Sequence, residues 1–170
     1  MKWTDRERRF FVSCVEELMD QAPVQTMDRF IQHGSTTCFW HCVAVAYMSY
    51  RLSLRLRLRC DRRGLIRGAM LHDFFLYDWH EKRGGHPLHG FTHPRTALRN
   101  AERCLPLNPV EREVILRHMW PLTPCPPRRR EALLVCLADK LCSLRETLRP
   151  AENLPGEPVR RLLALSSRRV

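Results

Sequence analysis

Two neighbouring residues of this 170-residue chain, His72 and Asp73, carry side chains that can bind metal ions and move protons. They lie within an apolar stretch, Gly-Ala-Met-Leu-His-Asp-Phe-Phe-Leu-Tyr, at residues 68–77. An imidazole and a carboxylate in a buried helix are unfavourable unless a partner satisfies them, and a bound metal ion would do so. The pair therefore predicts a metal site if other ligand-type residues converge on it.

Further ligand-type residues are embedded among apolar neighbours elsewhere in the chain. Each belongs to a different expected helix, so packing these helices around one centre would bring four His and two Asp together. Imidazole and carboxylate without thiolate suit divalent Fe, Mn, Zn or Co. The set is too large for one catalytic ion with open positions and suits two ions, which Asp73 could bridge through its two oxygens. The additional residues are His41, His93, His118 and Asp139.

Taken singly, these residues also have simpler interpretations. His41 or His118 alone is compatible with a satisfied core histidine, and Asp139 alone with a buried salt bridge to an arginine. The Gly- and His-rich segment 78–93 is expected to be a binding loop. Within it His80, His86 and His89 are expected to be solvated, although His89 could replace His93 as a ligand.

The elements that must position these residues are nearly all helical, because apolar residues recur at helical spacing. The predicted fold class is therefore all-α, a bundle of about six to eight helices around a metal site. The run 51–59 alternates Arg and Leu like a strand, but it also continues an amphipathic helix, which we favour. The first expected helices are 4–20, with Thr4 and Glu7 as a capping box, 24–32, ended by Gly34, and a long helix after Thr37.

The later helices also have start signals in the sequence. Asp61 caps a helix whose C-terminal half holds His72 and Asp73. Thr92 with Pro94, and Asn108 with Pro109, mark the starts of the next two. The last helix covers residues 128–148, and its expected apolar face is Leu133, Leu134, Leu137, Leu141 and Leu144.

The length suits a single domain, residues 1–170, with a core at about 28–148. The helix 4–20 and the tail 150–170 are expected to be peripheral. No apolar run approaches the roughly 18–20 residues that would span a bilayer, so no membrane partner is expected. The charged start lacks a signal-peptide pattern, which predicts a cytoplasmic location.

The 8 cysteines include no Cys-x-x-Cys pair, which argues against a zinc-finger or thioredoxin-like site. Most are expected to be reduced, buried thiols that behave as small hydrophobic residues. Cys38 and Cys42 lie one helical turn apart beside His41, so a metal role for them stays open. The net charge of +11 favours anionic partners. Nucleic acid is possible but not favoured, because aromatic residues are not interleaved with the basic ones as stacking platforms.

The order His41, His72-Asp73, His93, His118, Asp139 resembles the HD-domain metal-dependent phosphohydrolase superfamily over residues 28–148. His41, His72, Asp73 and Asp139 match the minimal signature, and the other two histidines resemble those of the dinuclear branch. The run Ala138-Asp139-Lys140, with a histidine opening the helix after the pair, is similar to bacterial HD proteins that hydrolyse diadenosine tetraphosphate. The run Leu-His-Asp-Phe-Phe-Leu-Tyr-Asp-Trp-His most resembles small uncharacterised bacterial HD proteins.

Two departures argue against a cyclic dinucleotide substrate. The chain lacks the Gly-Tyr-Pro signature of cyclic-di-GMP phosphodiesterases, and Phe74-Phe75 stands where one subgroup has Ile-Gly. Di-iron oxygenases of the superfamily use the same ligand arrangement. The ligands alone therefore leave both hydrolysis and oxidation open.

The resemblance implies two metal ions that share Asp73, one with His41, His72 and Asp139 and the other with His93 and His118. A bridging hydroxide would cleave a phosphoester or phosphoanhydride of an anionic, nucleotide-like substrate, with Asp73 and Lys140 as catalytic residues. Because adjacent helical residues point about 100° apart, Lys140 is expected only at the rim. The alternatives are a di-iron oxygenase and a non-enzymatic basic binding module. The cations expected to bind substrate phosphates are Lys82, Arg83 and Arg95.

Overall fold

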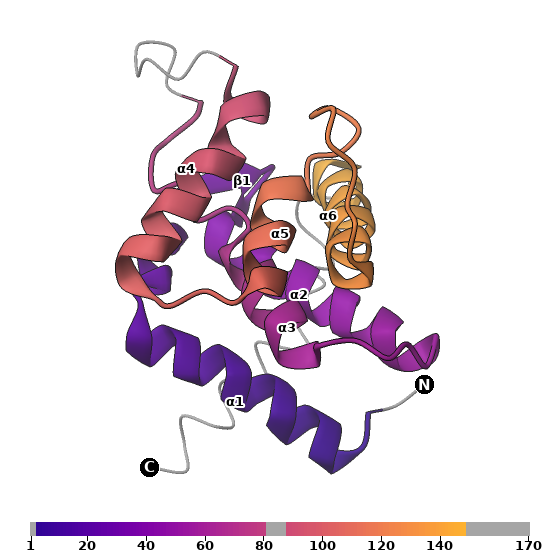
Figure 1. Ribbon diagram of the computed structural model, residues 1–170. Helices are drawn as coiled ribbons and strands as arrows, with labels where there is room; N and C mark the ends of the chain where they lie inside the picture. Colours follow the sequence, from indigo (N-terminus) through magenta and orange to yellow (C-terminus); the bar gives the residue numbers. More distant parts are fainter. Residues whose placement is uncertain (1–2, 81–87, 149–170) are drawn as a thin grey trace.

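The computed structural model describes residues 3–80 and 88–148, and this part of the chain is a helical bundle, as predicted (Figure 1). It contains seven helices, one of them a short 3-10 helix, and one two-stranded hairpin. In chain order the elements are α1 (Asp5–Gln21), η1 (Val24–Arg29), β1 (Ile31–His33), β2 (Thr36–Thr37), α2 (Cys38–Arg55), α3 (Arg62–Leu71), α4 (His89–Cys104), α5 (Pro109–Arg117) and α6 (Arg130–Leu148).

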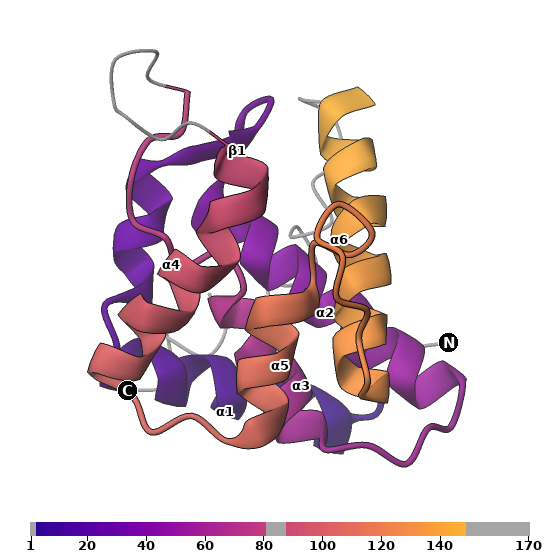
Figure 2. The same cartoon turned by 45° about the horizontal axis from the view of Figure 1, so that its top comes forward.

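The centre of the bundle is formed by α2, α3, α5 and α6. Helix α2 packs against α3 and α6, and α5 packs against the same two helices. Figure 2 shows α4, α5 and α6 side by side on one face, while α1 lies across one end of the bundle. Helix α1 contributes Phe11, Val15 and Leu18 to the buried core. The four central helices surround the space into which the candidate ligands project.

Local capping chemistry starts several helices where the sequence predicts. Thr4 and Glu7 form a capping box at α1, and Asn108 and Glu111 form one at α5. The Asp61 side chain accepts a hydrogen bond from the Gly64 amide at the start of α3. These caps satisfy backbone N–H groups that have no partner inside the helix.

The structure differs from the prediction at the hairpin and at α4. The short helix expected to reach residue 32 ends at Arg29, and the chain turns at Gly34, whose φ of 57° lies in the left-handed region. Strands β1 and β2 then pair in antiparallel orientation. Helix α4 begins at His89, earlier than expected, so Pro94 lies inside it and His93 lies in its second turn.

The predicted apolar face of the last helix was wrong in its orientation. Of those five leucines only Leu134 is buried, and the other four form an exposed row that ends at Leu148. The buried face instead presents mostly small residues and three carboxylates, Glu131, Asp139 and Glu146. Despite the exposed leucines, no helix in the described part is long and apolar enough to cross a membrane.

Candidate metal centre

The six predicted ligands come together, although they belong to five different segments of the chain. His41 lies on α2, His93 on α4 and Asp139 on α6. His72 and His118 are the C-cap residues of α3 and α5, and Asp73 follows directly. The pair therefore lies at the end of its helix rather than inside it. Each of the six residues is at least nine-tenths buried.

Close packing between α3 and α5 places the two helix ends beside each other. Arg67 of α3 donates from Nε to Glu111 Oε1 of α5 at 2.6 Å, and both side chains are buried. At the next residue of α3, a Cβ on Gly68 would lie 2.9 Å from Val114 Cβ, so only glycine fits there without a shift. The rings of His72 and His118 consequently lie 4.8 Å apart between centroids.

One carboxylate oxygen of Asp73 faces the ligands on the α2 and α6 side. Its Oδ2 lies 3.4 Å from His72 Nε2 and 3.8 Å from His41 Nε2. Oδ1 of Asp139 lies 3.1 Å from His41 Nε2 and 3.8 Å from His72 Nε2. His41, His72 and Asp139 thus offer ligand atoms within 4.8 Å of one another.

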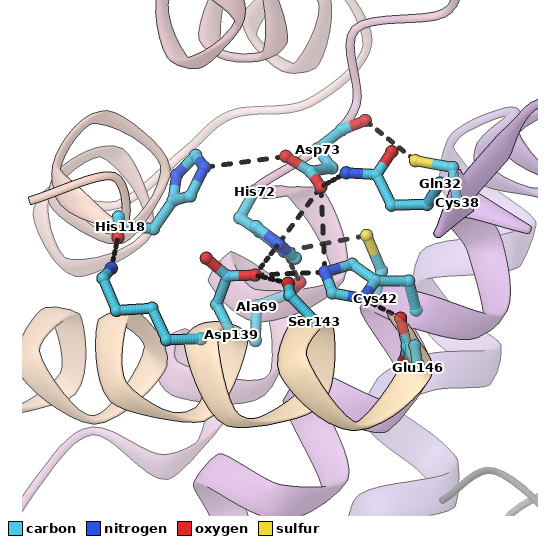
Figure 3. Close-up of polar contacts among 12 residues, drawn as sticks. Gln32, Cys38, Cys42, Ala69, His72, Asp73, His118, Asp139, Ser143 and Glu146 are labelled. Atoms are coloured by element: carbon cyan, nitrogen blue, oxygen red, sulfur yellow. Dashed lines mark hydrogen bonds and ion pairs between the residues drawn. The ribbon is translucent and has the colours of Figure 1, made fainter. Parts of the chain in front are cut away.

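The other oxygen of Asp73 faces the ligands from α4 and α5. Its Oδ1 lies 3.1 Å from His93 Nε2 and 3.6 Å from His118 Nε2. Figure 3 shows Asp73 with His118 on one side and Gln32 on the other, while Asp139 lies below them on α6. His72, Asp73 and His118 form a second group of ligand atoms within 4.8 Å of one another. Each oxygen of the Asp73 carboxylate therefore faces a different pair of histidine ring nitrogens.

All four histidines turn the same nitrogen away from the centre. Nδ1 of His72, His93 and His118 contacts the carbonyl oxygens of Ala69, His89 and Ile115 at 2.7, 2.9 and 2.8 Å. Since a carbonyl only accepts, each of these Nδ1 atoms donates a proton. Nδ1 of His41 contacts the carboxylate of Glu146 at 2.8 Å. In the neutral rings the Nε2 lone pairs then point inward, as metal ligation requires.

The contact between His93 Nε2 and His118 Nε2, at 2.8 Å, is informative. Both rings use Nδ1 as the donor, so as neutral rings they would direct two lone pairs at each other. Only a cation, either a proton or a metal ion, makes such a contact favourable. This half of the site is thus arranged to share a positive charge.

The pKa shifts agree with a centre that keeps its carboxylates ionised. Burial alone would raise the pKa of Asp73, but the charges of His72 and His93 hold it far below its ordinary value. Burial would lower the pKa of His41, whereas hydrogen bonds with Asp139 and Glu146 raise it well above that of a free histidine. Burial and the charges of His72 and His93 lower the pKa of His118 to about 3.

The residues present fit a divalent metal ion. His72 Nε2 and Asp73 Oδ1 are buried atoms without a hydrogen-bond partner among the described residues, and both lie at the centre of the ligand set. Unsatisfied buried polar atoms are rare in folded proteins, and a metal ion would satisfy both. The buried His and Asp groups can therefore hold a metal ion.

Comparison of the chain with protein-family models, with curated proteins and with solved structures found no match.

A cavity of about 730 Å³ leads to this centre. Three of the ligands that line it, His93, His118 and Asp73, belong to the half of the site around Asp73 Oδ1, and Asp139 lines it from the opposite half. Its volume is within the range of pockets that bind small molecules. The remaining lining residues are Gln32, His33, Trp79, His89, Gly90, Met119, Pro121, Leu122, Lys140 and Ser143.

The predicted cations do not form one group at this cavity. Lys140 lines it, but its Nζ donates to His118 O at 3.1 Å and contacts Cys136 O at 3.3 Å and Cys136 Sγ at 3.2 Å. These contacts tie Lys140 to the end of α5 and favour a structural role. Arg95 is exposed on α4 and is not among the lining residues, so the cavity does not support a substrate contact for it. Lys82 and Arg83 lie outside the described residues.

The other histidines and the two thiols lie around the ligand set. His89 lines the cavity and lies near Tyr77 and His93, whereas His80 is exposed and contacts Asp78. His86 lies outside the described residues. Cys42 Sγ lies 3.6 Å from His72 Nδ1, the nitrogen that faces away from the centre. Cys38 Sγ donates to the backbone oxygen of Asp73 at 3.3 Å. The two thiols therefore belong to neither group of candidate ligand atoms and lie on the side of the ligands that faces away from the centre.

Three residues that support the candidate ligands were not predicted from the sequence. Gln32 Nε2 donates to Asp73 Oδ2 at 2.6 Å, Glu146 holds His41, and Ser143 Oγ donates to Asp139 Oδ1 at 3.2 Å. Glu146 could have been found, because it follows Asp139 by two helical turns and shares its face. Gln32 has no such signal, since it reaches the centre through the unpredicted strand β1.

Proposed function

We propose that this chain is a metal-dependent phosphohydrolase of the HD type with a two-metal site that shares Asp73. The observation that supports this proposal best is that the two oxygens of the Asp73 carboxylate face different histidine nitrogens. Oδ2 faces His72 Nε2 at 3.4 Å and Oδ1 faces His93 Nε2 at 3.1 Å. A bridging carboxylate with histidines on both sides is suited to two ions about 3.5–4 Å apart.

The residues would hold the ions as the resemblance implies. His41, His72 and Asp139 would bind one, His93 and His118 the other, and Asp73 both. Such ions lower the pKa of a bound water and clamp the oxygens of a phosphoryl group when they are present. The protein supplies ligand orientation through four fixed Nδ1 contacts, and it supplies a cavity that ends at the centre. Fe, Mn, Zn and Co all suit these ligands.

An anionic substrate fits the charge of the chain. The formal net charge of +11 raises the local concentration of anions around the molecule. In contrast, the candidate ligands include two buried carboxylates, Asp73 and Asp139, and the buried Glu146 lies beside them against His41. A phosphate group would approach this centre only after divalent cations had outweighed these negative charges. Hydrolysis should therefore depend strictly on the metal.

The test is metal analysis of the purified chain together with phosphate release from a panel of phosphoesters and nucleotides. We expect more than one divalent ion per chain and activity that a chelator abolishes and Mn or Co restores. Asp73→Asn should lower kcat/KM by about 10³-fold, whereas Asp20→Asn, an exposed carboxylate on α1, should leave it unchanged.

Three outcomes would contradict the proposal. Less than one ion per chain with full activity in Asp73→Asn would exclude the two-metal mechanism. Oxygen uptake that requires iron, without phosphate release, would identify a di-iron oxygenase instead. Salt-sensitive nucleic-acid binding that survives His72→Ala, with no turnover of any ester, would identify a basic binding module.

A further inference from the structure

The side chains that form the walls of the cavity differ in polarity from the candidate metal ligands His93, His118, Asp73 and Asp139, which form its floor. One wall is formed by Met119, Pro121 and Leu122, which follow α5. This wall approaches the start of α4 closely, because a Cβ on Gly90 would lie 2.9 Å from Leu122 Cδ2. The wall is thus apolar and bounds the cavity directly above the ligands His93 and His118.

Another part of the wall is a column of aromatic rings that starts at His93, a candidate metal ligand. His89 stacks on His93 with 4.5 Å between ring centroids, and Trp79 stacks on His89 at 5.1 Å and an interplanar angle of 8°. Trp79 also contacts the ring of His80, with 3.8 Å between centroids. Trp79 and His89 both line the cavity, and His89 makes edge-to-face contacts with Phe75 and Tyr77. Aromatic rings in a cavity wall favour contact with another aromatic ring.

Cationic groups are scarce on these walls. Among the described lining residues Lys140 alone is a lysine or arginine. An ammonium group has three donors, and the contacts of Lys140 with His118 O, Cys136 O and Cys136 Sγ occupy all three. A chain of several phosphoryl groups would therefore find no free cation on the walls described, beyond the metal ions at the floor.

We infer that the preferred substrate is a phosphomonoester of an aromatic or similarly flat, apolar group, rather than a linear polyphosphate. This inference rests on the proposed function, because the two metal ions would bind the single phosphoryl group. The body of the substrate would contact Trp79, His89 and the apolar wall at Leu122, which all line the cavity. A volume of about 730 Å³ accommodates a phosphate with an attached ring system.

The test measures binding without turnover, by calorimetric titration of the metal-loaded protein with phosphonates that are not hydrolysed. We expect phenylphosphonate to bind at least about tenfold more tightly than methylphosphonate and methylenediphosphonate. Leu122→Ala should weaken phenylphosphonate binding several-fold and leave methylphosphonate unchanged. The control Leu133→Ala alters an equally exposed leucine on the outer face of α6 and should change neither. Trp79→Leu provides a second variant, on the aromatic part of the wall.

Equal affinities for the three probes would overturn the inference. So would tighter binding of methylenediphosphonate, and a loss of that binding in a Lys82→Ala, Arg83→Ala double variant would locate the responsible cations. These results are separable from a failure of the proposed function. If the protein prefers phenylphosphonate but releases phosphate from no ester, the proposed hydrolase function is wrong. If it hydrolyses phosphate esters but prefers polyphosphates, only the inferred substrate class is wrong.

Discussion

The side-chain amide of Gln32 donates a hydrogen bond from Nε2 to Oδ2 of Asp73 over 2.6 Å. Gln32 is buried on β1, and it fixes the carboxylate from the side opposite to His118 (Figure 3). The Nε2 atom cannot itself replace a metal ligand at this position, because it carries no lone pair for a cation. Its effect is to orient the carboxylate whose two oxygens face the two ligand sets.

Replacement of Gln32 should therefore weaken metal binding without removing a ligand. We expect Gln32→Met, which keeps the volume, to lower metal affinity about 10–100-fold, as is usual for groups that orient ligands. The measurement is competition with a chelator of known affinity. The matched control is Gln25→Met on the exposed side of η1, which should bind metal like the parent chain. Unchanged affinity in Gln32→Met would show that Asp73 needs no support from β1.

Glu146 should act on metal binding through His41. Its Oε2 accepts from His41 Nδ1 at 2.8 Å, and the glutamate is buried. Glu146→Gln keeps an acceptor but removes the charge, so we expect its metal affinity to be about tenfold lower than that of the parent chain. Glu146→Leu removes the acceptor as well, and its metal affinity should be about 100-fold lower. Glu102→Gln, which alters a surface carboxylate paired with Arg112, is the control. Equal affinities in Glu146→Gln and Glu146→Leu would contradict a role for the hydrogen bond.

Gly68→Ala should destabilise the fold although alanine is the better helix former. Helix propensity alone predicts a gain of about 1 kcal/mol. The added Cβ would instead lie 2.9 Å from Val114 Cβ and 3.3 Å from the Cα of Glu111, so α3 and α5 must move apart. We expect a loss of about 1–3 kcal/mol and a Tm lower by about 3–10 °C.

Thermal unfolding of the two chains, with metal content measured in parallel, checks the Gly68→Ala prediction. The metal content should fall as well, because α3 and α5 end at the ligands His72 and His118. Gly68→Ala with Val114→Ala should recover part of the stability, since the second change removes the Cγ1 contact at 3.0 Å. A higher Tm in Gly68→Ala alone would show that the helices tolerate a wider spacing.

The cysteines should separate into two classes by alkylation. Cys104 and Cys125 are exposed, whereas burial raises the pKa of Cys14 to about 11. With that pKa, Cys14 is thiolate at pH 8 in only about one part in a thousand. The Cys14 alkylation rate should rise about tenfold per pH unit up to about pH 11. Peptide mass spectrometry after timed alkylation measures this, and equal rates for Cys14 and Cys104 at pH 8 would contradict it.

Features that depend on local chemistry were readable from the sequence. The N-caps Thr4, Asp61 and Asn108 were predictable because a cap and the amide it satisfies lie within a few residues of each other. The ligand residues were recognisable because polar side chains among apolar neighbours are rare in helices. The helical fold class followed from periodicity, which is also local.

Contacts between distant segments were decided only by the tertiary structure. Helix α6 shows this most clearly, because its leucine row is the stronger apolar pattern and yet faces outward. The face with Ala138 and Cys142 allows close approach to α2, and only that orientation brings Asp139 and Glu146 to His41. Packing likewise decides three further features of the site. They are the hydrogen bond from Gln32 to Asp73, the contact of the Lys140 ammonium with His118 O, and the position of Asp73 between two sets of histidine nitrogens. The sequence by itself determined which side chains could bind a metal, whereas helix packing decided which oxygen faces which ring, because those distances join residues far apart in the chain.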